Sequence, residues 1–199
     1  LLSDLLEHDV DRAEEFARSL IPLPPPLGGD QRARAIVVAR ALMTSAKDCG
    51  WSHAWKAIQQ DSEFGREVIS SVAHFPGLGA GKIGQRLTED QLADLYLWIV
   101  CQYPHAEDPR SEEAHSVGPR ESIAMWRDSI LSHLKGRGTP QACQAIRRIA
   151  LELPELGWLK WTILEAQDLA RRRTWLPPLP HDILKLARYQ GGHLVQNGS

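Results

Sequence analysis

The sequence is poor in the features that mark secreted, disulfide-bonded and membrane-spanning proteins. Its three cysteines, Cys49, Cys101 and Cys143, lie far apart within apolar helical patterns. An odd, scattered set predicts neither a disulfide framework nor a zinc site, so these thiols are expected to behave as small core residues. We expect no signal peptide, and no apolar run approaches the roughly 20 residues that span a bilayer. These absences favour a cytoplasmic protein.

Charge of one sign and β-type patterning are also missing. The formal net charge is −2, so no overall field attracts nucleic acid or an anionic membrane, and any such role needs a local patch. No segment shows sustained alternation of apolar and polar residues, so no sheet is expected. The chain begins at Leu1, without an initiator Met, and its last ten residues lose helical periodicity. We therefore expect a segment of a longer polypeptide that is not an enzyme by itself.

What the sequence does contain is a succession of helix signals. Apolar stripes with helical spacing predict helices from Val10–Leu20 onwards. Thr88 and Gln91 form a capping box, Thr139 is followed by a first-turn proline, and Asp30 is expected to cap a helix that runs to about residue 48. A last short helix is expected around residues 183–187.

Short helices with tight turns between them indicate an all-α fold. We predict an irregular HEAT-like α-solenoid of antiparallel helix pairs, with a compact helical bundle as the alternative. The predicted organisation is an N-terminal helix and Pro-rich linker (1–27), a helical repeat domain (28–189) and a flexible C-terminal tail (190–199).

A glycine-rich stretch, residues 76–84, superficially resembles a phosphate-binding loop. Pro76 stands where such a loop needs its first glycine, and Ile83 stands where it needs Ser or Thr to hold magnesium. We therefore interpret the stretch as a connecting loop and expect no nucleotide there.

The polar segment 103–118 lies between two strong helices, where interaction sites concentrate. With the aromatic and basic residues of the flanking helices, it is the predicted binding surface. Its candidate residues are Trp98, Tyr103, His105, Glu107, Asp108, Trp126 and Arg127.

The same segment carries metal-ligand residue types. His105, Glu107, Asp108 and His115 could serve a metal-dependent hydrolase, but they lie in a proline-interrupted loop and not on rigid elements. No metal and no cofactor are therefore expected.

A run of arginines offers a different function. Arg171, Arg172 and Arg173, with Arg147 and Arg148, could bind phosphates of nucleic acid. The plainer interpretation is a set of cations that complement the dipole at a helix C-terminus. Nucleic-acid binding is kept as the alternative function.

Several motifs resemble a helical segment of large bacterial NACHT-type (STAND) NTPases. The motifs are TEDQLADLYLW (88–98), YPHAEDP (103–109), VGPRE (117–121), WRD (126–128), GT (138–139) and the stretch 171–180, which contains TWLPP. The resemblance covers about residues 30–197. It implies a HEAT-like region between an ATPase core and an effector, often nuclease-like, in antiviral defence. On this basis we expect a scaffold or sensor segment that binds a protein ligand or couples neighbouring domains of the same polypeptide.

Overall fold

The computed structural model describes residues 8–45, 50–73, 80–103, 119–153, 157–175, 187–190 and 193–196. Across these residues the chain is all-α, as predicted, apart from one small hairpin. The helices are α2 (Val10–Leu20), α3 (Gly29–Thr44), α4 (Trp51–Gln60), α5 (Ser62–Ala73), α6 (Ala80–Arg86), α7 (Glu89–Gln102), α8 (Pro119–Arg137), α9 (Pro140–Glu152) and α10 (Gly157–Trp175).

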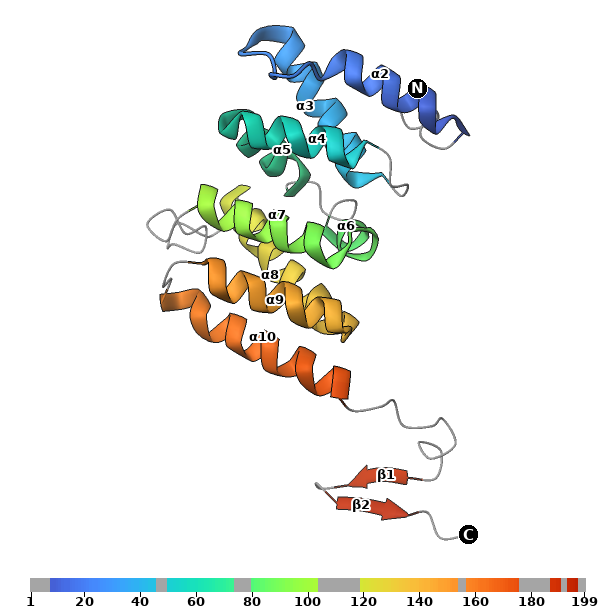
Figure 1. Ribbon diagram of the computed structural model, residues 1–199, viewed down its shortest axis with the longest axis vertical. Helices are drawn as coiled ribbons and strands as arrows, with labels where there is room; N and C mark the ends of the chain where they lie inside the picture. Colours follow the sequence, from blue (N-terminus) through green and yellow to red (C-terminus); the bar gives the residue numbers. More distant parts are fainter. Residues whose placement is uncertain are drawn as a thin grey trace.

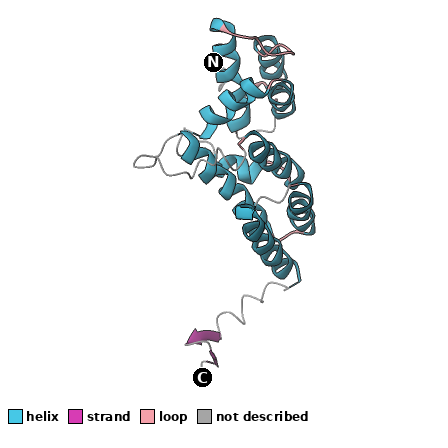
Figure 2. Ribbon diagram, turned by 90° about the vertical axis from the view of Figure 1, so that its left-hand side faces the viewer, coloured by secondary structure: helices cyan, strands magenta, loops and turns pink. Residues whose placement is uncertain are grey.

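The helices follow one another along one long axis, from α2 at the N-terminal end to α10 (Figure 1). Helices α4, α7, α9 and α10 face the viewer, and α5 and α8 lie behind them. After a turn of 90°, several helices are seen nearly end-on along a curved line (Figure 2). Each helix packs on its neighbours in the stack, for example α3 on α5, α7 on α9, and α9 on α10.

The predicted helix starts are confirmed where side chains cap them. The Thr88 hydroxyl accepts from the Gln91 backbone N–H, and the Gln91 side chain accepts from the Thr88 N–H. Thr139 accepts from the N–H of Ala142 with Pro140 in the first turn, and α8 begins at Pro119. Local sequence therefore sets these starts, because each cap satisfies an N–H group that the helix leaves unpaired.

Two predicted boundaries are wrong. Gly28, and not Asp30, occupies the N-cap of α3, and the helix ends at Thr44, before the expected residue 48. Part of the predicted glycine-rich loop is helical, because α6 begins at Ala80 and includes Gly81 and Gly84. Gly84 is buried against His133 of α8, and this packing outweighs the low helix propensity of glycine.

The hairpin was not predicted. Strand β1 (Ala187–Gln190) pairs antiparallel with β2 (His193–Gln196), so Ala187 belongs to a strand and not to the expected final helix. The predicted tail, 190–199, thus contains β2. The register pairs Gln190 with His193 and leaves a Gly-Gly pair between the strands, which is a recognised hairpin signal.

An apolar cluster runs through the stack from Ala13 in α2 to Ala170 in α10. Two arginines donate hydrogen bonds to the C-terminal carbonyl groups of helices in this stack. Arg86, at the end of α6, donates to the carbonyl oxygens of Leu42 and Met43 at the C-terminal end of α3. Arg137, at the end of α8, does the same for α6, with 2.8 Å between its Nη2 and the Gly84 oxygen. The C-terminal carbonyl groups of a helix lack partners within it, so each arginine fastens one helix to an earlier one.

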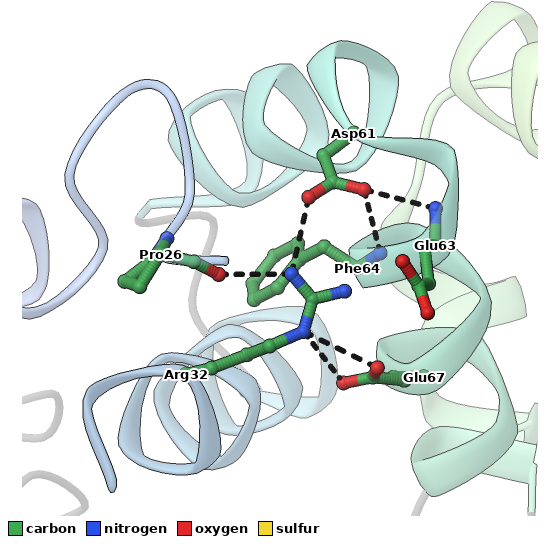
Figure 3. A network of polar contacts seen from close by, with 6 residues as sticks. All are labelled: Pro26, Arg32, Asp61, Glu63, Phe64 and Glu67. Carbon is green, nitrogen blue, oxygen red and sulfur yellow. Dashed lines mark hydrogen bonds and ion pairs between the residues drawn. The ribbon is translucent and has the colours of Figure 1, made fainter. Parts of the chain in front are cut away.

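Arg32 is buried and fastens the N-terminal segment to the stack (Figure 3). Its Nη1 lies 2.8 Å from the Pro26 carbonyl oxygen and 3.1 Å from Oδ2 of Asp61, and its Nε lies 3.1 Å from Oε2 of Glu67. Burial lowers the pKa of Arg32, but the hydrogen bonds with Glu67 and Asp61 raise it by more, so the net shift is upward. The guanidinium therefore stays charged and joins the proline-rich segment and α3 to α5.

Asp61 has a second task at the start of α5. Its Oδ1 accepts from the backbone N–H groups of Glu63 and Phe64, at 3.0 and 2.9 Å (Figure 3). The Phe64 N–H lowers the pKa of Asp61 most, burial opposes the shift, and Arg32 lowers the pKa further. The carboxylate thus caps a helix and neutralises a buried cation at once.

Replacing Arg32 with Met should destabilise the fold. Asp61 and Glu67 are partly exposed, so their carboxylates would regain some hydration in the variant. We therefore expect the free energy of unfolding to fall by about 1–3 kcal/mol, which is less than the cost of leaving a fully buried charge without a partner. Urea unfolding measures this change. Arg18→Met removes an exposed ion pair with Glu14 and should cost less than about 0.5 kcal/mol. Equal effects of the two substitutions would contradict the anchoring role of Arg32.

Asp61 should make stability depend on acid pH. Its pKa is lower in the folded state, so its contribution is present above the unfolded pKa of about 3.9 and is lost as the pH falls through the folded value. Asp61→Asn should therefore be less stable than the wild type at neutral pH and should lose less stability between pH 7 and about 3. Urea midpoints across this range test it, with the exposed Asp11→Asn as control. Parallel pH profiles for wild type and Asp61→Asn would refute it.

Candidate functional site

A groove of about 250 Å³ crosses three stacked helices. Helices α4, α7 and α9 each contribute to its wall. The lining residues are Trp55, Gln59, Asp94, Leu97, Trp98, Cys101, Arg148 and Glu152. Because three successive layers meet here, the groove combines side chains that are distant in sequence.

Indole rings form one wall of the groove. Trp55 of α4 and Trp98 of α7 meet edge to face, with ring centroids 6.2 Å apart and planes inclined by 66°. Trp51 stacks on Trp55 with 5.7 Å between centroids and an angle of 12°. Trp51 is buried, whereas Trp55 and Trp98 are half-buried, so the inner ring supports Trp55, which in turn contacts Trp98.

Charged side chains form another part of the lining. Arg148 of α9 lies 2.6 Å from Oδ1 of Asp94 on α7 and 2.6 Å from Oε1 of Glu152 on its own helix. Glu152 raises the pKa of Arg148 most, and Asp94 adds to the rise. All three groups are partly exposed, so the cluster is available to a ligand while it ties α7 to α9.

The position of Trp98 depends on a glycine in the neighbouring layer. Gly65 of α5 is buried, and a Cβ atom added there would lie 2.5 Å from Cζ2 of Trp98 and 2.9 Å from the Ile58 carbonyl oxygen. Both distances are shorter than real contacts allow. The Trp98 indole therefore occupies the space that a side chain at position 65 would fill.

The structure separates the predicted site residues. Trp98 lines the groove, whereas Tyr103 lines another, wider hollow of about 700 Å³ with Ile36 of α3 and residues of α5. Trp126 and Arg127 are only 2% and 1% exposed, so both side chains lie in the core and not on a surface. The Arg127 guanidinium donates to Asp128.

Other predicted residues fall outside the part of the chain that the structure describes. These are His105, Glu107, Asp108 and His115. Among the described residues, no group of three or more His, Cys, Asp or Glu side chains could hold a metal ion. Within the same residues, no helix is both long and apolar enough to cross a bilayer.

The arginine run is only partly a free cationic surface. Arg171 and Arg172 are exposed near the end of α10, and Arg172 lies 2.7 Å from Oδ2 of Asp168. The Arg173 side chain lies outside the description. Arg148, counted with this run from the sequence, is instead held by carboxylates in the groove.

Comparisons of the chain with protein-family models, with curated proteins and with solved structures found no match. The groove must therefore be interpreted from its own geometry and chemistry.

Sequence reasoning missed most of the groove. From the sequence, Arg148 is counted with a basic patch, and Trp55 is not among the candidate residues. The spacing of Arg148 and Glu152, four residues apart on one helix, was a readable signal for an ion pair. The contact of Arg148 with Asp94 joins residues 54 positions apart, and no local pattern indicates it.

Gly65→Ala should displace the Trp98 indole. Overpacking against the ring and the Ile58 carbonyl should cost about 1–3 kcal/mol, despite the better helix propensity of alanine. Urea unfolding and the indole ¹H–¹⁵N signal of Trp98 measure the two effects. Gly28→Ala meets no atom within 4 Å and is the matched control. An unchanged Trp98 signal in Gly65→Ala would show that the contact is not needed.

Proposed function

We propose that this chain is a non-catalytic helical scaffold that binds a protein ligand through the groove on α4, α7 and α9. The observation that carries the proposal is the composition of the groove. Two indole rings in mutual contact and a partly exposed cluster of charges line one groove across three layers of the stack. Aromatic and arginine side chains are enriched where proteins bind proteins.

The finer architecture in this proposal is a HEAT-like α-solenoid and not a compact bundle. Supporting this, α2 and α10 lie at opposite ends of the long axis, and packing links mainly elements that are close in the order of the chain (Figure 1). A solenoid suits a scaffold because stacked helix pairs present an extended surface.

The proposal places the segment in a NACHT-type (STAND) NTPase of a defence system, where it would bind a protein ligand or couple ATPase and effector domains. The support is the sequence resemblance of residues 88–109 and of the motifs that follow. Residues 88–98 form the N-cap and the first part of α7, and this helix supplies Asp94, Leu97 and Trp98 to the groove.

Crosslinking in the cells that produce the protein tests the proposal with matched glutamate substitutions. Glu152→Arg reverses a charge inside the groove, and Glu165→Arg reverses an exposed charge on α10. A protein that crosslinks to the wild-type chain should give at least about tenfold less product with Glu152→Arg, because the substitution removes a groove carboxylate and places a second cation beside Arg148. Glu165→Arg should leave the product unchanged. Circular dichroism confirms that both variants fold.

An equal amount of crosslinked product from the wild-type chain and from Glu152→Arg would contradict a role for the groove. Recovery of DNA or RNA that depends on Arg171 and Arg172, and that decreases steeply with salt, would instead favour the alternative function of nucleic-acid binding.

A further inference from the structure

We infer that the groove on α4, α7 and α9 accepts a lysine or arginine side chain from an extended segment of a partner protein. This inference deepens the proposed function and rests on it. It names the chemistry of the partner, and three observations carry it: the volume of the groove, its charge and its fixed indole rings.

The volume fits a side chain better than a free small molecule. The groove measures about 250 Å³, and sites for small molecules usually measure roughly 300–1,000 Å³ and are concave and mostly apolar. Three of the eight lining residues are charged here, and the groove lies open on the stack. A segment that passes over this surface can place one long side chain into the groove while its backbone remains outside.

The charge of the groove favours a cation. Its charged lining residues are Asp94 and Glu152, both negative, and Arg148, which is positive, so the lining carries a net charge of −1. The Arg148 guanidinium is already occupied by the two carboxylates at 2.6 Å. An incoming anion would meet both carboxylates, whereas an incoming guanidinium or ammonium group would share them. Opposite charges attract across such a partly exposed site, and like charges repel.

The indole rings favour the same ligand. A cation held within about 6 Å of an indole face is attracted by the negative charge of that face, and the aliphatic stem of Lys or Arg packs on apolar surface. Trp55 is fixed by stacking on Trp51, and Trp98 by the space over Gly65. Rings that are already in place lose little freedom when the ligand binds, so their contacts count fully towards affinity.

The test uses three synthetic peptides: acetyl-Gly-Leu-Arg-Leu-Gly-amide and the same peptide with Glu or Gln in place of Arg. Each is titrated into ¹⁵N-labelled chain while the indole N–H signals are followed. Trp55→Phe and Trp98→Phe assign the two groove signals. The arginine peptide should shift both signals, and the glutamate and glutamine peptides should bind at least about fivefold more weakly.

Two substitutions in the groove make the charge argument decisive. Arg148→Gln changes the net charge of the lining from −1 to −2 and should tighten binding of the arginine peptide by about two- to fivefold. Asp94→Asn changes it from −1 to 0 and should weaken binding by a similar factor. Glu165→Gln, an exposed site on α10, is the control and should leave binding unchanged.

Three results would overturn the inference. One is preferential binding of the glutamate peptide, another is loss of binding in Arg148→Gln, and the third is no indole shift at about 1 mM arginine peptide, where a weak site of this kind should fill. The first would leave the proposed scaffold function standing with an acidic partner, and the second would leave it standing with a ligand that contacts Arg148 directly. The third leaves that function to the Glu152→Arg crosslinking result, which uses the natural partner in place of a peptide.

Discussion

The burial of apolar helix faces against successive neighbours is the interaction on which the rest of this structure depends. The apolar cluster that links α2 to α10 grows by one layer at a time, so each helix is held mainly by the elements beside it. Such a stack has little to keep its layers in register. Arg86 and Arg137 supply that constraint, because each reaches from the end of one helix to the open carbonyl groups of an earlier one.

The charged residues of the stack divide by their surroundings. Arg32 is hydrogen-bonded to Asp61, Glu67 and a backbone carbonyl, so its charge is neutralised within the fold. Arg148 also has two carboxylate partners, but all three of its groups reach solvent. The same pairing chemistry therefore anchors a segment at one position and leaves polar groups exposed to solvent at another. Burial alone makes the difference, since exposed ion pairs add little to stability.

Local sequence signals predicted much of the fold. The contacts between layers could not be predicted from them. The capping box of Thr88 and Gln91 and the Thr139 cap are short-range, and both are confirmed. Which face of a long helix is buried is harder to predict. Helix α8 is packed by α5, α6, α7, α9 and α10, so Trp126 and Arg127 both turn inward although Arg127 is charged. The groove could not be predicted, because its walls come from helices that meet only after the stack forms.

The geometry of the groove therefore depends on how the layers are spaced. Its indole wall joins α4 to α7 through Trp55 and Trp98, and its charged wall joins α7 to α9 through Asp94 and Arg148. A change in the angle between any two of these helices would alter a ring contact or an ion pair. A ligand that touches both walls therefore binds one spacing better than others, and by linkage it stabilises that spacing to the same extent. In the proposed function, ligand recognition and the spacing of the helices are therefore coupled at this surface.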